Sequence, residues 1–197
     1  YVLEPGDMLY LPPKWAHDGL AEGECMTYSV GFRSPKQDEL ARELFLRLSD
    51  APDECPKDVV YKDPKQTAVA HPGEIPAALL DFARQALEKA LAEPLALERA
   101  LGETLSDPKP GVWFEPADDF GLIENVRLNQ RTRMLYDAQH IFINGESYLA
   151  AGRDAELMRQ LADTRQLSSA EVQQLSDDAL QLLSSWVDAG WAHSTAG

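Results

Sequence analysis

The chain has 197 residues, of which 44% are hydrophobic and 26% charged, so it can bury the core of one or two globular domains. Its 33 acidic and 18 basic residues give a net charge of −15. This charge disfavours direct binding to nucleic acid, because proteins that bind nucleic acid concentrate Lys and Arg in a patch. It favours encounter with a basic partner instead.

Hydropathy and cysteine content indicate the compartment. No apolar run approaches the length of a membrane span, and no export signal is recognisable, so we expect neither membrane contact nor secretion. Cys25 and Cys55 fit no metal-binding spacing and no disulfide framework. A reduced, cytoplasmic protein is the simplest interpretation.

The first distinctive stretch runs from residue 6 to residue 17 and ends on a histidine. Met8-Leu9-Tyr10-Leu11 is a short apolar run typical of a buried strand, and Pro12-Pro13 end it. His17 follows this proline corner, with Trp15 two residues before it, so its backbone is constrained beside an apolar wall. Metal ligands are often held in this way, although a packed or surface histidine has the same local sequence. His17 is therefore a candidate metal ligand.

A second strand is predicted over residues 25–33, where side chains alternate in character. Small and polar residues fall on one face, and large apolar residues fall on the other. Thr27 and Ser29, on the polar face, are candidates to hydrogen-bond a bound carboxylate. The alternative is that this polar face is simply solvated and the apolar face lies in the core.

The spacing of Gly6, Pro12 and His17 is similar to the second conserved motif of the cupin superfamily, and Trp-x-His after prolines resembles its JmjC branch. Two positions depart from the general cupin pattern, with Lys14 where glycine is usual and Ala21 where asparagine is usual. Together with Tyr28-Ser29-Val30-Gly31-Phe32-Arg33, the stretch resembles the bacterial YcfD-type ribosomal oxygenases.

This resemblance implies an Fe(II)- and 2-oxoglutarate-dependent dioxygenase that hydroxylates an arginine of a large-subunit ribosomal protein. It implies that His17 is the last ligand of a triad of two histidines and one carboxylate. The other two ligands of the family come from an upstream His-x-Asp. None of the four histidines here is followed two residues later by an acid: His17, His71, His140 and His193.

Because the chain begins with Tyr1 in strand-like sequence and lacks the His-x-Asp, we expect it to be the C-terminal part of a longer protein and inactive by itself. Two strands cannot close a barrel. The rival interpretation is a small complete protein with a different fold.

Three amphipathic helices are predicted after the motif. A proline-rich loop over residues 50–76 separates the first helix from the second. Ser34 is a suitable N-cap, and Pro35 is tolerated at the first helical position. The leucine- and alanine-rich faces need a partner surface, which is either the same domain or a second subunit. In the resembled family a helical segment mediates dimerisation. The predicted helices span about residues 34–49, 76–93 and 95–106.

Residues 107–111 carry two prolines and a glycine and form the clearest boundary. After a short strand at 133–136, Asn144-Gly145 predicts a hairpin between residues 138–144 and 146–150, in which His140 is a cross-strand neighbour rather than a ligand. Helices follow at 154–164, at the Ser168/Glu171 capping box, and from Ser176 to Asp188 before Gly190. This pattern resembles a winged helix, but thirteen acids against six Lys and Arg in residues 112–197 favour protein contact over DNA binding.

We therefore predict an α+β fold in three parts. Residues 1–35 would hold the last strands of a cupin (JmjC) double-stranded β-helix, residues 36–110 a helical dimerisation segment, and residues 111–197 a winged-helix-like domain. The predicted function is that of a ribosomal protein hydroxylase that acts on a basic protein as a homodimer. The alternative is a non-enzymatic acidic scaffold for dimerisation or protein binding.

Overall fold

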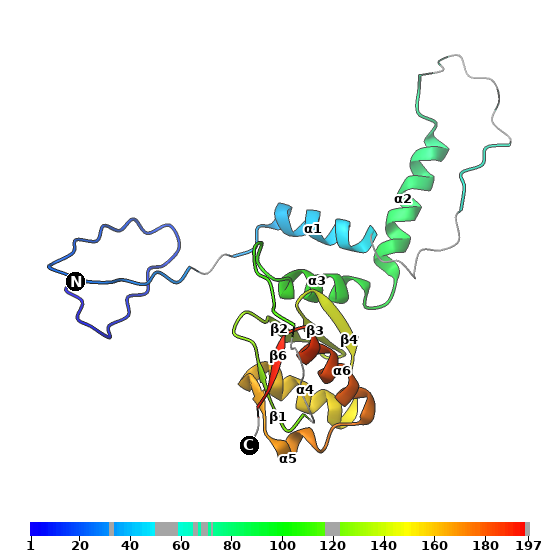
Figure 1. Ribbon diagram of the computed structural model, residues 1–197. Coiled ribbons are helices and arrows are strands. Elements are labelled where there is room, and N and C mark those ends of the chain that lie inside the picture. The colour runs from blue at the N-terminus through cyan, green and yellow to red at the C-terminus, as the bar shows by residue number, and fades with distance from the viewer. Residues whose placement is uncertain are drawn as a thin grey trace. The chain divides into compact units, whose positions relative to one another are not determined.

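The computed structural model describes residues 1–31, 34–49, 59–64, 67, 71, 73–116 and 123–195, and the chain divides into two compact units, Tyr1–Pro35 and Lys36–Gly197 (Figure 1). Phe32, Arg33, Cys55 and much of the expected loop at 50–76 lie outside the described residues. The two units are described separately below.

The described residues of the first unit form neither helix nor strand, so the strands predicted at 8–11 and 25–33 are not formed in the described part of this unit. The backbone makes turns instead, in which the amide of Asp7 donates to the carbonyl oxygen of Glu4 and the amide of Trp15 donates to that of Pro12. A strand is stable only when it pairs with neighbours. The alternating pattern is present here, but the structure pairs it with no other described strand.

Three helices open the second unit, as the apolar spacing predicted. They are α1 (Gln37–Ser49), α2 (Ala77–Ala92) and α3 (Ala96–Ser106). Helix α1 begins three residues after the expected Ser34 cap. Leu95 joins α2 to α3 in the left-handed region, with a φ of 62°.

The remainder of the unit mixes short strands with helices. The predicted hairpin, the capping box and the helix from Ser176 are confirmed, whereas three short strands were not predicted. The elements are β1 (Asn125–Leu128), β2 (Met134–Tyr136), β3 (His140–Ile143), β4 (Glu146–Leu149), α4 (Gly152–Thr164), β5 (Gln166–Leu167), α5 (Ser169–Val172), α6 (Asp177–Asp188) and β6 (Ala192–Thr195).

These strands form two antiparallel sheets with the orders β5-β1-β6 and β2-β3-β4. In the second sheet, Ile143 pairs with Glu146 across the tight turn at Asn144 and Gly145. Both turn residues have positive φ, 48° and 91°, which is the conformation of a two-residue type I′ hairpin. This turn fixes the register of the whole hairpin.

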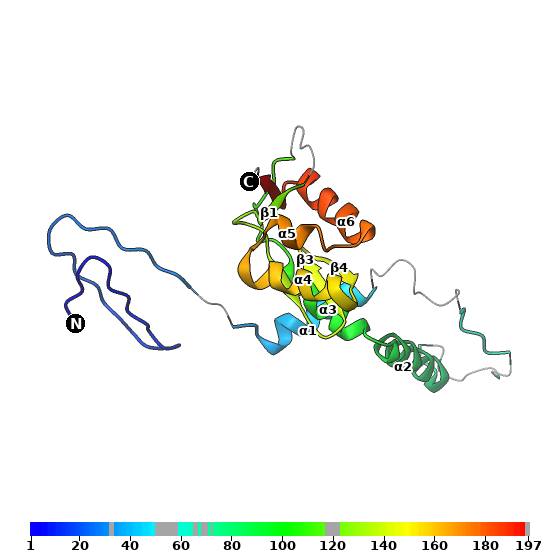
Figure 2. The same ribbon diagram turned by 90° about the horizontal axis from the view of Figure 1, so that it is seen from below.

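The main core lies between the two sheets and helices α4 to α6. Ile141 and Ile143 of β3 enter it together with Leu161 of α4 and Leu183 and Trp186 of α6, all at most 2% exposed. Figure 2 shows α4, α5 and α6 gathered around the strands. Helix α6 ends at Asp188, as predicted, and the stop signal Gly190 has a φ of 74°, which suits glycine.

Helix α3 covers the opposite face of the hairpin. Residues alternate along β3, so Phe142 points away from Ile141 and Ile143 and meets α3 at Gly102. A Cβ atom added to Gly102 would lie 2.2 Å from the Phe142 ring. The helix therefore approaches the sheet as closely as a glycine permits.

Candidate functional site

The three residues proposed for metal and cofactor binding all lie in the unit Tyr1–Pro35. The side chains of His17, Thr27 and Ser29 are exposed, and none of them hydrogen-bonds to another residue in the described part of the unit. Across the described ranges, no three His, Cys, Asp or Glu side chains gather in a group that could hold a metal ion. Among the described residues, His17 therefore has no two other possible metal ligands grouped with it.

His140 has a structural role. His140 is 4% exposed, pairs across the strands with Leu149, and stacks on Phe142 with ring centroids 5.4 Å apart. Its Nδ1 lies 3.1 Å from Oδ2 of Asp137. The expectation that His140 is a cross-strand neighbour is confirmed.

Asp137 also holds the chain in place at the start of β3. Burial opposes ionisation of this carboxyl, but hydrogen bonds from the backbone amides of His140 and Gln139, and from the His140 side chain, outweigh burial and lower its pKa. The carboxylate therefore caps the start of the strand.

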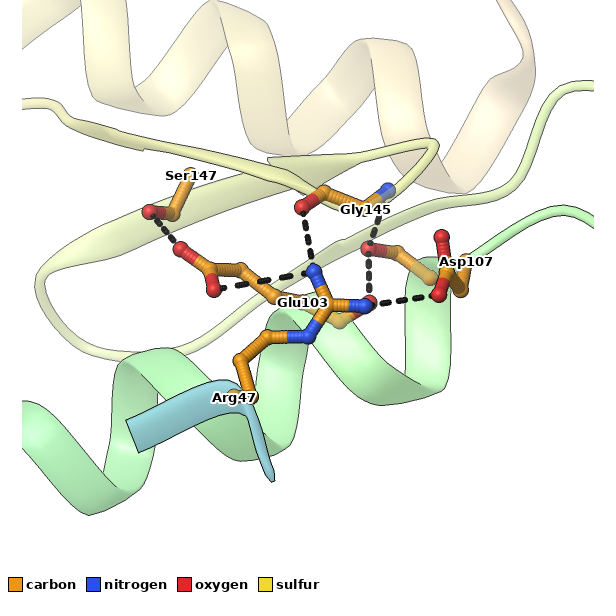
Figure 3. A network of polar contacts seen from close by, with 6 residues as sticks. Arg47, Glu103, Asp107, Gly145 and Ser147 are labelled. Carbon is orange, nitrogen blue, oxygen red and sulfur yellow. Dashed lines mark hydrogen bonds and ion pairs between the residues drawn. The ribbon is translucent and has the colours of Figure 1, made fainter. Parts of the chain in front are cut away.

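A polar network joins the helical segment to the tip of the hairpin (Figure 3). Arg47, in the last turn of α1, donates from Nη2 to Oδ2 of Asp107 over 2.6 Å and from Nη1 to the carbonyl oxygen of Gly145 over 3.2 Å. Glu103 of α3 lies 3.9 Å from Nη1 and accepts a 2.6 Å hydrogen bond from Ser147. The sequence carried no sign of this network, because Arg47 reads as an ordinary polar residue of an amphipathic helix.

A cleft of about 650 Å³ opens beside strand β4. One wall comes from the α2–α3 junction and the start of α3, the other from the start of α6, and the hairpin forms the side between them. The lining includes Leu95, Ser147, Tyr148, Leu149, Asp154, Asp178, Leu182 and Trp186.

Two aromatic residues in this lining carry polar groups. The rings of Tyr148 and Trp186 meet edge to face, with centroids 5.7 Å apart. Burial, together with hydrogen bonding to Glu146, raises the pKa of Tyr148 to about 12, an effect that the nearby Trp186 indole opposes. The indole Nε1 of Trp186 is buried and, among the described residues, meets no acceptor with hydrogen-bond geometry.

Comparison with known families identifies both ends of the chain. A JmjC domain model matches residues 1–40, and a ROXA-like winged-helix model matches residues 85–193, more than half of the chain. The chain belongs to the ROXA-like winged-helix family. The match to the JmjC domain falls on the stretch that carries His17, Thr27 and Ser29.

Individual relatives are similar to the chain along nearly all of its length. The chain is 27% identical over 204 residues to the ribosomal protein uL16 3-hydroxylase of Escherichia coli (strain K12), which covers 96% of this chain and 52% of the relative. It is 24% identical over 229 residues to a probable ribosomal oxygenase of Haemophilus influenzae, covering 97% and 54%. The ROXA-like chain therefore spans about half the length of these relatives.

Solved structures show the same fold. The crystal structure of Escherichia coli ribosomal oxygenase YcfD matches with a TM-score of 0.64 at 21% identity, over 84% of this chain and 48% of that one. YcfD in complex with cobalt and 2-oxoglutarate matches with a TM-score of 0.61 at 19% identity, over 83% and 47%. Within the described residues of the ROXA-like chain, no helix is both long and apolar enough to cross a membrane.

Proposed function

We propose that the chain is part of an Fe(II)- and 2-oxoglutarate-dependent dioxygenase that hydroxylates an arginine side chain of the large-subunit ribosomal protein uL16. The observation that carries this proposal is the likeness to a uL16 3-hydroxylase over 96% of the chain, joined to a JmjC match over residues 1–40. The complex of YcfD with cobalt and 2-oxoglutarate supports the choice of cofactor and co-substrate.

In this proposal His17 is one iron ligand. Its imidazole is exposed and, in the described residues, forms no hydrogen bond that would divert it. A 2-oxoglutarate oxygenase needs two histidines and one carboxylate on the metal. The described residues supply one of these and do not form a metal site by themselves. For this reason we expect residues 1–197 alone to lack hydroxylase activity.

Thr27 and Ser29 are proposed to bind the oxoacid. Their hydroxyls are exposed two residues apart, and in a paired strand residues at this spacing share one face. Hydroxyl groups donate hydrogen bonds to carboxylates, which suits a dicarboxylate co-substrate.

The three-part division at residues 1–35, 36–110 and 111–197 also remains a proposal. Helix α3 of the second part packs on the hairpin of the third.

We further propose that the protein forms a homodimer through α2. This helix has no buried residue, and although Phe82 packs on Tyr61, four of its leucines face solvent. Leu79, Leu80, Leu87 and Leu91 are 37% to 58% exposed. The net negative charge of the chain favours a basic protein partner over direct contact with nucleic acid. We also propose that the protein lies in the cytoplasm, where the ribosomal proteins are. The exposed α2 face would equally serve the alternative, a non-enzymatic acidic scaffold.

The enzymatic proposal is tested with a His17→Ala variant. The variant is made in the full-length protein that the native cell produces. We expect the variant to lose hydroxylation of uL16, measured as addition of one oxygen atom by mass spectrometry, and to bind Co²⁺ more weakly in calorimetry. His71→Ala is the matched control, because His71 is also exposed but lies outside the JmjC match. Wild-type hydroxylation and cobalt binding in His17→Ala would refute the ligand assignment, and an inactive wild-type protein would favour the scaffold.

A further inference from the structure

Among the described strands β4 pairs only with β3, so its other edge can accept another strand. It lies at the end of the sheet β2-β3-β4 (Figure 1). In antiparallel pairs, hydrogen-bonded and non-hydrogen-bonded positions alternate. The tight turn makes Ile143 and Glu146 a hydrogen-bonded pair, and the 3.1 Å bond from the Ala150 amide to the carbonyl oxygen of Gln139 fixes the same alternation at the far end.

It follows that Ser147 and Leu149 occupy the non-hydrogen-bonded positions opposite Phe142 and His140. Their backbone N–H and C=O groups point away from β3, toward the open side of β4. Within the described ranges these four groups form no hydrogen bond with another residue. The edge thus offers two donors and two acceptors at alternate residues, which is the pattern that an added strand requires.

The cleft beside β4 gives an added strand room and an apolar floor. Its lining contains Ser147 through Ala151 of the edge, with Leu95 on the α3 side and Leu182 on the α6 side. The Leu149 side chain is 76% exposed. The indole N–H of Trp186 is buried behind the lining, where it lies near the Tyr148 hydroxyl.

Charge in the lining of the cleft selects the chemistry of the partner. Asp154 and Asp178 both line it. The carboxylate of Asp154 already accepts hydrogen bonds from the Ser176 amide and hydroxyl, whereas that of Asp178 is exposed at the start of α6. Arg99 also lines the cleft and has an interaction partner of its own. In a chain of net charge −15, this leaves Asp178 to attract a cation.

We propose that the β4 cleft binds an extended, basic segment of the protein substrate, which adds a strand to the free edge of β4. Backbone hydrogen bonds to Ser147 and Leu149 would hold the segment, and Asp178 would pair with a Lys or Arg side chain. That the segment belongs to uL16 rests on the proposed function. The binding chemistry itself, an extended basic peptide, does not.

The test uses the intact protein and fluorescent overlapping peptides that cover uL16. Leu149→Pro removes the outward N–H, while proline is tolerated on an edge strand and the ladder to β3 does not use this group. We expect the affinity of the bound peptide to fall about three- to tenfold, as for the loss of one hydrogen bond. Asp178→Asn should weaken binding at low salt and reduce its salt dependence. Asp188→Asn, the same change at the other end of α6, is the matched control and should bind as wild type.

Amide hydrogen exchange gives a second readout if Leu149→Pro fails to fold. Bound peptide should slow exchange at the Ser147 and Leu149 amides of the wild-type protein and leave the Tyr148 amide, already paired with β3, unchanged. Unaltered exchange at Ser147 and Leu149 in the presence of saturating peptide would overturn the proposal.

The outcomes separate this inference from the proposed function. Hydroxylation of uL16 with an unchanged KM in folded Leu149→Pro would refute the edge site and leave the hydroxylase intact. Peptide protection of the Ser147 and Leu149 amides in a protein that hydroxylates nothing would support the edge site and refute the hydroxylase. If the proposal holds, Leu149→Pro raises KM for uL16 and leaves kcat unchanged.

Discussion

Arg47 in the last turn of α1 donates a hydrogen bond to the carbonyl oxygen of Gly145 at the hairpin tip, 98 residues away in the sequence. The same guanidinium also pairs with Asp107, directly after α3. Arg47 is 28% exposed, so solvent weakens these interactions only in part. One side chain thereby holds two helices and a hairpin in a common arrangement.

Arg47→Ala should lower the free energy of unfolding by about 1–2 kcal/mol, because it removes two charge-assisted hydrogen bonds. Urea denaturation measures this change. Arg42→Ala, at an exposed position of the same helix, is the control and should be near neutral. Arg47→Lys should recover only part of the loss, since an ammonium group cannot replace the planar fork. Equal stability of the Arg47 and Arg42 alanine variants would contradict the assigned role.

Gly102→Ala should destabilise the protein although alanine favours helices. The new Cβ would lie 2.2 Å from the Phe142 ring, so α3 would have to move off the sheet. Overpacking of this kind costs about 1–3 kcal/mol, measurable as a lower midpoint in thermal unfolding. Gly73→Ala is the control, because nothing lies within 4 Å of its added Cβ. Phe142→Leu should cancel part of the loss in a double-mutant cycle.

Tyr148 should make the protein sensitive to alkali. Its pKa is raised by burial and by Glu146, from 10.0 to about 12. The folded state therefore holds the phenolic proton more tightly than the unfolded state does, so its contribution to stability is complete below pH 10 and is lost as the pH rises toward 12. Phenolate absorbance should show a tyrosine that titrates near pH 12 and is lost in Tyr148→Phe, whereas Tyr136, whose pKa is also raised by its hydrogen bond to Asp163, should titrate in both proteins. A titration curve identical in both proteins would contradict the assignment.

The α2 face should carry the proposed dimer. Leu87→Glu places a charge among exposed leucines, each worth about 1.5–3 kcal/mol when buried in an interface, so the dimer should dissociate. Light scattering during size-exclusion chromatography measures the mass. Gln85→Glu introduces the same charge on the same helix at a position outside the apolar face. A wild-type protein that is monomeric at every concentration would exclude the dimer outright.

Elements marked by local chemistry could be predicted from the sequence. Asn144-Gly145 specifies its turn by backbone conformation alone, and Ser168 with Glu171 forms its capping box within one helical turn. In contrast, β1, β5 and β6 were missed. Each has at most four residues, and each exists only because distant strands pair, as Val126 does with Leu167 and Ser194. Pairing across such separations leaves no local mark.

In the candidate site, too, the features with a local sequence pattern could be predicted and those that depend on packing could not. The motif around His17 is a local pattern and could be recognised from spacing, and the JmjC match falls on it. Its role as a ligand, like those of Thr27 and Ser29, stays a prediction. The Arg47 network and the cleft beside β4 depend on which elements pack together. Neither the spacing of charges in α1 nor the alternation in β4 could have indicated them.

The pairing of β1 with both β5 and β6 also bears on how the protein is made. Strand β1 is synthesised before β5 and β6, and the cross-strand partner of Leu128 is Ala192, near the end of the chain. While translation proceeds, the apolar residues of β1 have no completed sheet to enter. The module can close its core only after nearly all of it has left the ribosome, and contacts of such long sequence separation make that closure slow.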